Sequence, residues 1–413
     1  MLHMAQPILV IGANGYVSNH MKSHIRHGYI LKNVTYVPFR SFYNPSKPIS
    51  DCVAKIYNSY DISKYKFVIN CVGYTGENNI DDAAKDENIK KLKDLNVELP
   101  IHLAEQLPKS DKVFCQMSTG CIYYSYKGNG EYWEETDEPT NKDLELFSRY
   151  SLSKYLTEKT LLDIRDKIYI WRIRLPIDDD FYNKKNYLYK ICNYKKILSM
   201  DNSYTHMQSF INSLSYFLDM KQEYYSDGGC MEYGVYNMTN LGYTNAKNIF
   251  NIIMKNSIKL PFSPEFYESY NEFMDNSGVV EHRSNCVLST NKFQNQVAKI
   301  KKHISRCPES VRQEIPTYLR YYDYHNSPSL LHNIDYAINK DLSLKFGSSI
   351  VSKAHPYATE FSAKFLNHDL YFGHVTNARS DIMAKYVKKW NKDLLSLPPL
   401  PEWQLGTTSS ESD

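Results

Sequence analysis

Residues 8–20 read ILVIGANGYVSNH, an apolar run followed by two glycines three positions apart. Gly12 would end a strand and Gly15 would open a helix, which is where a backbone turns tightly beside a phosphate group. The third glycine of the usual pattern is missing, because Ser18 occupies its position. The stretch predicts either a turn that binds the pyrophosphate of a dinucleotide or an ordinary strand-to-helix connection.

Six short apolar runs recur along the chain, and helix-like segments separate them. Buried strands joined by crossover helices form parallel sheets that are covered on both faces. We therefore predict an α/β fold, a Rossmann-type doubly wound parallel sheet that binds ligands at the carboxyl ends of its strands. The predicted strands lie at 7–12, 34–39, 66–73, 112–119, 168–176 and 232–240.

The alternation of strands and helices stops after about residue 325. We predict that residues 326–413 form an appended C-terminal extension with some helical periodicity. Its last part, at about 398–413, is rich in Pro, Ser, Thr and Glu, a composition typical of disorder. The composition assigns the extension no role.

The charge balance gives no sign of a polyanionic partner. A formal net charge of +3 arises from 49 basic and 46 acidic residues, so neither nucleic acid nor a membrane surface is indicated. The eight cysteines show no C-x-x-C pair and no Cys/His zinc spacing, and we expect no metal site. The sequence shows no secretory signal pattern and no apolar stretch of roughly 20 residues, so we expect a cytoplasmic protein.

The residue after the second predicted strand bears on the choice of cofactor. In Rossmann domains that bind NAD, an acidic side chain at this point binds the ribose 2′-hydroxyl. The strand here ends VPFRS (37–41), which places Arg40 there instead. A guanidinium suits a 2′-phosphate, so we expect NADPH as the preferred cofactor and NADH as the alternative. The other interpretation of Arg40 is an ordinary solvated side chain.

Two residues on one helix indicate a proton donor. The stretch STGCIYY (118–124) follows the fourth predicted strand, and YSLSK (150–154) lies further along on a helical segment. Tyr150 and Lys154 would share one helix face. A cation beside a phenol lowers the pKa of the phenol, so Tyr150 could protonate a carbonyl oxygen while hydride reaches the carbon. The same spacing recurs elsewhere in this tyrosine-rich chain, and only its position after a Ser/Thr-bearing strand selects Tyr150.

Several further stretches keep a characteristic order and spacing. They are NCVGYTGENNID (70–81), LNVELPIHLAE (95–105), STGCIYY (118–124), YSLSK (150–154), RIRLPI (172–177), KNYLYKICNYKKIL (185–198), YNMTNLG (236–242) and HRSNCVLSTNKF (282–293). With the glycine turn, they resemble the extended short-chain dehydrogenase/reductase superfamily, and most of all its nucleotide-rhamnose synthase/epimerase-reductase group. The resemblance implies an NAD(P)-binding domain at 1–325, with a cofactor part mainly at 7–180 and a smaller substrate-binding part mainly at 181–325.

The resemblance assigns roles around a sugar carbonyl. Thr119 would hydrogen-bond the C4 carbonyl of the substrate, Tyr150 would be the general acid and Lys154 would adjust the pKa of Tyr150. Asp61 and Ile62 would contact the adenine of the cofactor. The implied cofactor-binding residues are Gly12, Asn14, Gly15, Tyr16, Val17, Arg40, Asp61, Ile62, Cys71, Val72, Gly73 and Lys154.

Two further residues distinguish an epimerase from a simple reductase. Inversion at C3 or C5 needs one group to remove a proton and another to return one from the opposite face. Cys121 and Lys190 match the positions that perform this step in the family, although Cys121 could instead be a small core residue and Lys190 a solvated lysine. Asn78 and Arg283 would contact the substrate, and a plain surface arginine is the alternative for Arg283.

These residues lead to one expected function and two alternatives. We expect NADPH-dependent 3,5-epimerisation and 4-reduction of a nucleotide-linked 4-keto-6-deoxyhexose, giving a UDP- or dTDP-L-rhamnose type sugar, in a protein that could form a homodimer. One alternative is a 4-keto reductase without epimerase activity, and the other is a catalytically silent NAD(P)-binding regulator that acts through its extension. The intact set of Thr119, Tyr150 and Lys154 argues against silence. Ser18 and the loop at 76–87 depart from the family pattern, which bears on cofactor affinity and nucleotide specificity more than on the reaction class.

Overall fold

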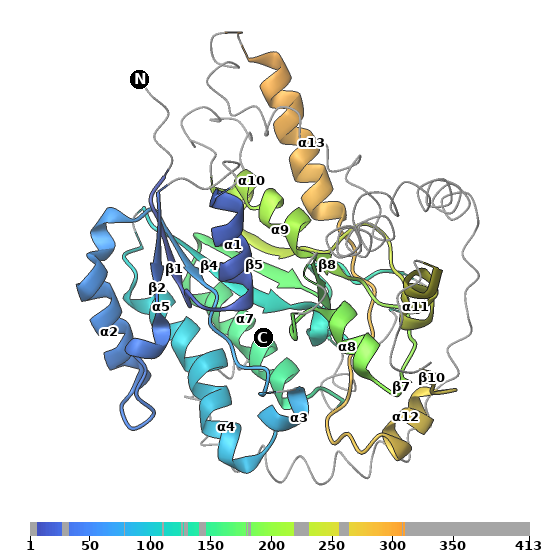
Figure 1. The fold of residues 1–413 in the computed structure, drawn as a ribbon. Coiled ribbons are helices and arrows are strands. Elements are labelled where there is room, and N and C mark those ends of the chain that lie inside the picture. The colour runs from blue at the N-terminus through green and yellow to red at the C-terminus, as the bar shows by residue number, and fades with distance from the viewer. Residues whose placement is uncertain are drawn as a thin grey trace, which may run out of the picture.

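The computed structural model contains the parallel sheet that the sequence predicts (Figure 1). It describes residues 6–26, 33–77, 79–109, 111–124, 127, 131–139, 146–178, 180, 183–218, 231–255, 264–307 and 309. The whole predicted extension after residue 325 lies outside the described residues, and so does Asn78. The domain boundary at residue 325 therefore stays a prediction.

The described residues form one six-stranded sheet in the order β2-β1-β3-β4-β5-β9, and all neighbours are parallel. Each of the six predicted apolar runs contains one of these strands, so the predicted fold class is confirmed. Because β1 lies between β2 and β3, the strand order changes direction beside β1, which is where such sheets leave a ligand crevice. The strands are β1 (Ile8–Ile11), β2 (Val34–Val37), β3 (Phe67–Asn70), β4 (Val113–Thr119), β5 (Ile168–Ile173) and β9 (Gly234–Asn237).

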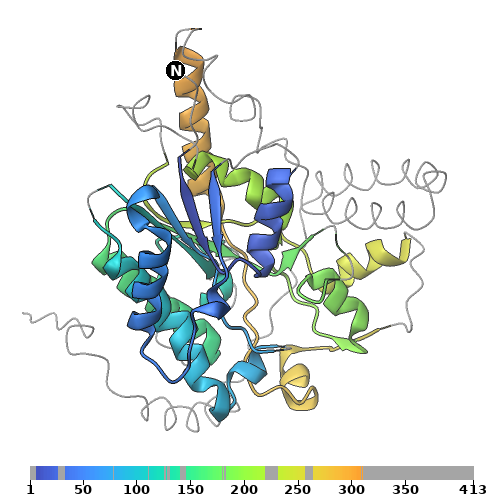
Figure 2. The same ribbon diagram turned by 60° about the vertical axis from the view of Figure 1, so that its left-hand side comes forward.

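Helices cover both faces of the sheet (Figures 1 and 2). Successive residues of a strand point to opposite faces, so Ile8 and Val10 join one core cluster while Leu9 and Ile11 join the other. The first face packs against α1 (Tyr16–Arg26), α9 (Met207–Ser213), α10 (Ser215–Leu218) and α13 (Asn291–Arg306). The second face packs against α2 (Ile49–Tyr60), α4 (Asp86–Lys93), α5 (Leu99–Gln106) and α7 (Arg149–Ile164).

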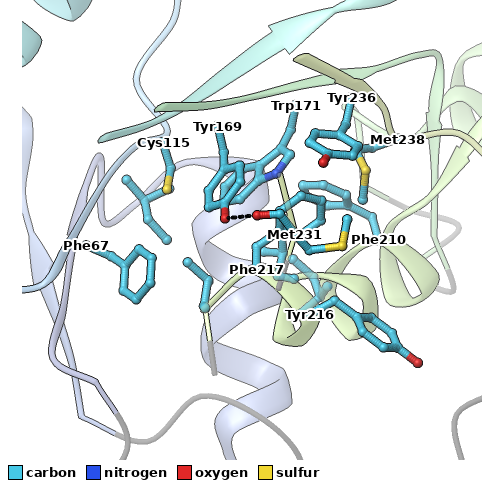
Figure 3. Close-up of a cluster of buried hydrophobic side chains, with 14 of the residues drawn as sticks. Phe67, Cys115, Tyr169, Trp171, Phe210, Tyr216, Phe217, Met231, Tyr236 and Met238 are labelled. Carbon is cyan, nitrogen blue, oxygen red and sulfur yellow. Dashed lines mark hydrogen bonds between the residues drawn. The ribbon is translucent and has the colours of Figure 1, made fainter. Parts of the chain in front are cut away.

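Aromatic side chains fill much of the first face (Figure 3). Trp171 of β5 is fully buried, and its ring lies 5.5 Å from that of Phe217 in an edge-to-face arrangement. The buried Tyr169 hydroxyl donates a 2.9 Å hydrogen bond to the Met231 carbonyl oxygen, so the cost of burying this polar group is offset. These contacts hold α10 against the strand that leads toward the carboxyl edge of the sheet.

A smaller group of elements lies together beside the sheet (Figures 1 and 2). It has its own apolar cluster, in which Ile177, Leu188 and Ile249 are fully buried. Most of its residues fall in the range predicted to bind substrate. Its elements are α8 (Tyr187–Asn193), α11 (Ala246–Lys255), α12 (Tyr270–Asn276), and the short strand pairs β6 (Pro176–Ile177) with β8 (Thr205–His206) and β7 (Lys196–Ile197) with β10 (Glu265–Phe266).

The connection between α4 and α5 contains an uncommon turn. Helix α4 continues into a π-helical turn, η3 (Asp94–Glu98), and α5 follows at once. A π-helical turn inserts one extra residue into a helix, and such turns are frequent at functional sites. Asn96, at the centre of η3, is fully buried.

Gly12 ends β1 in a conformation that residues with a side chain rarely adopt. Its φ is +101°, in the region that favours glycine. A Cβ atom at this position would lie 3.0 Å from the Val72 side chain and 3.2 Å from the Val72 nitrogen. Both the conformation and the close approach therefore require glycine.

We predict that Gly12→Ala lowers the free energy of unfolding more than Gly242→Ala does. Gly242 also has a positive φ, +86°, but a Cβ atom there would meet nothing within 4 Å. Gly242→Ala should therefore cost only the backbone strain, about 1–2 kcal/mol, whereas Gly12→Ala adds the contact with Val72. Urea unfolding of the two variants measures the difference. Equal losses would contradict the importance of the close approach.

Candidate active site

The loops that follow β1 and β3 lie against each other at the carboxyl edge of the sheet. The Cys71 amide donates to the Ile11 carbonyl oxygen at 2.9 Å, and the Gly12 amide donates to the Val37 carbonyl oxygen at 3.1 Å. The Gly15 amide donates to the Gly12 carbonyl oxygen at 3.0 Å and closes the turn before α1. The N-terminus of α1 is therefore placed beside the β3 loop, an arrangement suited to a pyrophosphate.

Ser18, at the position of the absent third glycine, packs into the interior. It is fully buried and lies beside Cys71. Burial raises the pKa of the Cys71 thiol to about 12, so this cysteine stays neutral. The serine therefore replaces the glycine without exposing the seam between α1 and β3.

Helix α7 carries the predicted proton donor. Ser148 caps its N-terminus, because the Ser148 Oγ accepts a 3.0 Å hydrogen bond from the Ser151 amide. Tyr150 follows in the first turn, and its side chain is hydrogen-bonded to Thr119 at the end of β4. The structure thus brings together the predicted acid and the predicted carbonyl-binding hydroxyl.

Lys154 lies one turn further along α7 and is buried against the β3 loop. Its Nζ donates to the Met117 carbonyl oxygen at 3.3 Å, and a Cβ atom added to Gly73 would lie 3.3 Å from the same Nζ. Burial lowers the pKa of Lys154 to about 8, and the Glu158 carboxylate opposes this shift. The lysine is therefore next to the predicted cofactor loop.

The expectation that the Tyr150 pKa is lowered is wrong for this structure. Burial raises the pKa of the phenol well above its usual value, and Cys121 raises it further. The hydrogen bond with Thr119 and the charge of Arg174 oppose the rise without cancelling it. The ammonium group of Lys154 instead contacts the Met117 carbonyl oxygen. A phenol that keeps its proton at neutral pH can still donate that proton to a carbonyl oxygen as negative charge develops there.

Asn96 fixes the loop that contains Gly73. Its Oδ1 accepts from the Tyr74 amide at 2.7 Å, and its Nδ2 donates to the Tyr74 carbonyl oxygen at 2.9 Å and to Ser153 Oγ at 3.2 Å. It therefore joins the β3 loop to α7. No role for Asn96 was assigned from the sequence, although an asparagine within the apolar stretch LNVELPIHLAE (95–105) is the signal that marks it.

Glu158 and Arg172 form a buried ion pair behind the site. Arg172 Nε and Nη2 donate to Glu158 Oε2 at 2.9 and 2.7 Å, and the two side chains are 7% and 2% exposed. The Ser118 hydroxyl donates to the other carboxylate oxygen of Glu158. Arg172 Nη1 donates to the Tyr123 hydroxyl at 2.7 Å. This network joins α7 to β4 and β5, and none of its members is assigned a role by the sequence.

Cys121 lies in the turn η4 (Gly120–Ile122), directly after β4. The Thr119 Oγ1 accepts a 3.1 Å hydrogen bond from the Cys121 amide and caps this turn. The Cys121 sulfur accepts a 2.7 Å hydrogen bond from Arg174 Nη1. Cys121 is half-buried and close enough to affect the pKa of Tyr150, so the structure places it beside the predicted acid.

Lys190 lies on α8, in the smaller group of elements. Burial lowers its pKa, and the nearby cations Lys185 and Arg283 lower it further. Arg283 is paired with Asp81, toward which both terminal nitrogens of its guanidinium donate. Arg283 therefore lies near enough to Lys190 to affect its pKa, and its guanidinium is engaged with a carboxylate of the protein. Its contact with a substrate stays a prediction.

The other predicted cofactor residues of the first loop lie at the carboxyl edge. Asn14, Tyr16 and Val17 belong to the β1 turn and to the start of α1. The Tyr16 hydroxyl donates to the buried Asp178, which follows β6. Arg40 is exposed in η1 (Phe39–Ser41), directly after β2. The cofactor contacts of these residues stay a prediction.

Asp61 and Ile62 lie at the opposite edge of the sheet. They precede β3, between α2 and the turn η2 (Ile62–Lys64), and the Ser63 carbonyl oxygen accepts a 2.7 Å hydrogen bond from Lys112, the residue before β4. The adenine contact predicted for them is therefore wrong, because the amino ends of the strands are remote from the glycine turn. Asp61 instead forms an exposed 3.0 Å ion pair with Lys64.

No group of side chains suited to a metal ion occurs among the described residues. Within the same part of the chain, no helix is long and apolar enough to cross a membrane.

A parallel sheet with a glycine turn after β1, and a Tyr/Lys helix beside the end of β4, form a Rossmann-type arrangement similar to that of short-chain dehydrogenases/reductases. The homologues of the chain are enzymes of nucleotide-rhamnose synthesis. No family model matches the chain.

Two of these homologues are proteins of Arabidopsis thaliana. A trifunctional UDP-glucose 4,6-dehydratase/UDP-4-keto-6-deoxy-D-glucose 3,5-epimerase/UDP-4-keto-L-rhamnose-reductase is 32% identical over 148 residues, which are 34% of this chain and 21% of the relative. A bifunctional dTDP-4-dehydrorhamnose 3,5-epimerase/dTDP-4-dehydrorhamnose reductase is 29% identical over 192 residues, which are 45% and 58% of the two proteins. The chain thus spans less than two thirds of the length of these relatives.

Two solved structures share the fold. The UDP-rhamnose synthase of Acanthamoeba polyphaga mimivirus superposes with a TM-score of 0.61 at 20% identity, covering 82% of this chain and 100% of the other. The dTDP-glucose 4,6-dehydratase of Bacillus anthracis, solved in complex with NAD, gives a TM-score of 0.51 at 13% identity, covering 82% and 97% of the two chains.

We predict that Glu158→Gln lowers the free energy of unfolding by about 3–5 kcal/mol, because Arg172 is left as a buried cation without its counter-charge. Lys159→Ala is the control, since it removes the neighbouring but exposed pair with Glu138. That loss should be below about 1 kcal/mol. Chemical denaturation measures both values. Similar losses in the two variants would mean that burial adds nothing to the strength of the Glu158 pair.

Proposed function

We propose that the protein catalyses NADPH-dependent 3,5-epimerisation and 4-reduction of a nucleotide-linked 4-keto-6-deoxyhexose, giving a UDP- or dTDP-L-rhamnose type sugar. The observation that carries this proposal is the convergence of Thr119, Cys121 and Tyr150 at the end of β4. A hydroxyl, a thiol and a phenol around one point supply what reduction and inversion of a keto-sugar both need. The activities named for the homologues support the substrate class.

The β1 and β3 loops fit a dinucleotide. A Cβ atom on Gly12 would fill the space beside Val72, so the glycine leaves the backbone open to a pyrophosphate. Lys154, whose Nζ lies beside Gly73, would contact the same molecule. When bound there, NADPH supplies the hydride that reduces C4.

Thr119 and Tyr150 would act at the C4 oxygen during reduction. The Thr119 hydroxyl orients the carbonyl, and the Tyr150 hydroxyl gives its proton to the oxygen as negative charge develops. The high pKa of the buried phenol keeps this proton in place until the carbonyl oxygen becomes basic. Lys154, beside Gly73, would hold the β3 loop in place while Tyr150 transfers its proton.

Cys121 and Lys190 would perform the inversion before reduction. The C4 carbonyl makes the hydrogens on C3 and C5 acidic, so removal of one gives an enolate whose charge rests on the C4 oxygen. The hydroxyls of Thr119 and Tyr150 then stabilise that oxygen. One of the pair takes the proton and the other returns one from the opposite face of the ring.

A reductase without epimerase activity would need Thr119 and Tyr150 but not a reactive Cys121. A silent dinucleotide-binding protein would need none of the three. The convergence of all three favours the bifunctional enzyme over both alternatives.

We predict that exchange and reduction can be separated by mutation. Wild-type protein given a UDP- or dTDP-linked 4-keto-6-deoxyglucose in D₂O without cofactor should incorporate deuterium at C3 and C5, because proton transfer needs no hydride. Cys121→Ser and Lys190→Ala should suppress this exchange and leave reduction of a sugar supplied in the inverted form. Tyr150→Phe should keep measurable exchange and lose reduction by a factor of about 10² to 10⁴. Mass spectrometry counts the deuterons and NMR identifies the sugar.

The outcomes of this experiment assign the function. Wild-type protein that reduces the ketone but incorporates no deuterium would be a plain 4-reductase. Protein that binds the cofactor but performs neither step would be the silent regulator. A Tyr150→Phe variant that reduces the sugar at the wild-type rate would remove Tyr150 as the acid.

We also predict that wild-type protein binds NADPH more tightly than NADH. Arg40 follows β2 at the edge where the ribose 2′-position is expected, and its exposed guanidinium can pair with a 2′-phosphate. Arg40→Ala should therefore weaken NADPH binding while changing NADH binding little. Lys47→Ala, which removes another cation of the same segment, is a matched control. Fluorescence titration with both cofactors gives the affinities, and equal wild-type affinities would refute the preference.

A further inference from the structure

Arg174 stands next to the site without a role in the reaction described above. It follows β5 directly, and its side chain is buried, with 2% of the residue exposed. Its Nη1 donates to the Cys121 sulfur at 2.7 Å. Its Nη2 donates to the Asn202 Oδ1 at 2.5 Å and to the Ser284 carbonyl oxygen. One terminal nitrogen of the guanidinium is therefore bound by the neutral oxygens of Asn202 and Ser284, and the other contacts the Cys121 sulfur.

The surroundings of Arg174 differ from those of Arg172, two residues earlier in the chain. Arg172 has a carboxylate counter-charge in Glu158. For Arg174, the described residues provide a sulfur, an amide oxygen and a carbonyl oxygen, but no carboxylate. Burying a guanidinium without an anion is costly.

Of the two thiols near Arg174, only Cys121 is placed to be the anion. Cys286 is fully buried, its sulfur donates to the Gly120 carbonyl oxygen at 3.2 Å, and burial raises its pKa. A thiol that donates a hydrogen bond must keep its proton. The Cys121 sulfur instead accepts from Arg174, and the residue is half-buried, not fully enclosed.

We propose that Arg174 is a positioning residue that pairs with Cys121 as the thiolate and aims this sulfur at the sugar ring. A hydrogen bond from a charged donor is strongest when the acceptor is negatively charged, and the thiolate is the form of cysteine that accepts a proton. The role of this pair in proton transfer rests on the proposed epimerase function. In this proposal Arg174 acts through Cys121 and not on the substrate itself.

The chemical step balances with the groups already named. The Cys121 thiolate takes the proton from C3 or C5, so the S–H bond forms as the C–H bond breaks. The electron pair passes into the enolate, with its charge on the C4 oxygen. The ammonium group of Lys190 then returns a proton to the other face and re-forms the C–H bond. Exchange of protons with solvent restores the thiolate and the ammonium group.

The reactivity of Cys121 toward iodoacetamide tests the proposal directly, because the alkylating agent reacts with thiolates. Mass spectrometry of the full chain after brief alkylation at neutral pH gives the rate at Cys121 relative to that at Cys307. Cys307 is a partly exposed cysteine at the end of α13 and serves as the internal reference. Arg174→Ala should lower the relative rate about 10- to 100-fold, and dilute guanidinium chloride should restore part of it. Arg174→Lys keeps the positive charge but loses the planar guanidinium, so its relative rate should lie between those of the wild type and Arg174→Ala.

Guanidinium rescue separates a charge effect from a loss of structure, since a merely structural role would not respond to it. If Arg174→Ala does not fold, Arg174→Lys is compared with the wild type instead. A lower relative alkylation rate of Cys121 in Arg174→Lys still supports the Arg174–Cys121 pair. An unchanged relative rate in every folded variant overturns the proposal.

Deuterium exchange on the same samples distinguishes this inference from the proposed function. Exchange that falls together with alkylation in Arg174→Ala supports both. Rapid wild-type alkylation that depends on Arg174, without any exchange, retains the pairing but removes the epimerase function and with it the catalytic role of the pair. Exchange that persists at the wild-type rate in Arg174→Ala overturns the role of Arg174 and leaves the proposed function intact.

Discussion

The buried ion pair between Glu158 and Arg172 is the constraint on which the site depends. A carboxylate and a guanidinium withdrawn from water are tolerated only when each satisfies the other and their remaining hydrogen-bonding groups are occupied. Ser118 and Tyr123 complete that requirement. Because Glu158 belongs to α7, and the other three residues of the network to β4, β5 and the loop after β4, the pair fixes the helix against the sheet.

Two consequences follow for the residues of α7 that contact β4. Tyr150 and Lys154 precede Glu158 on this helix, so the ion pair adds to their own contacts with Thr119 and Met117 in fixing their positions. The same withdrawal from water shifts both of their pKa values, raising that of the phenol and lowering that of the ammonium group. The burial of this part of α7 therefore fixes the positions of Tyr150 and Lys154 and shifts their pKa values together.

The architecture could be predicted from the sequence more fully than the site. All six strands of the main sheet lie inside the predicted apolar runs, because strands buried on both faces have a strong local signature. The Thr119/Tyr150 contact was also predictable from its position after β4. Asp61 was misplaced because sequence distance does not reveal which edge of the sheet a connection occupies. Glu158 and Arg174 were missed because a buried charge is recognised only by its partner, which lies on a different element of the fold.

The π-helical turn at Asp94–Glu98 has a consequence for how this segment tolerates change. Each residue advances a helix by about 100°. The extra residue in this turn therefore sets the rotational phase between α4 and α5. Deleting it would leave a continuous helix in which either Asn96 faces away from Tyr74 or Leu99 and Leu103 leave the core. Substitutions in this turn keep the rotational phase between α4 and α5. A one-residue deletion would instead break either the contact of Asn96 with the Tyr74 loop or the packing of Leu99 and Leu103 in the core.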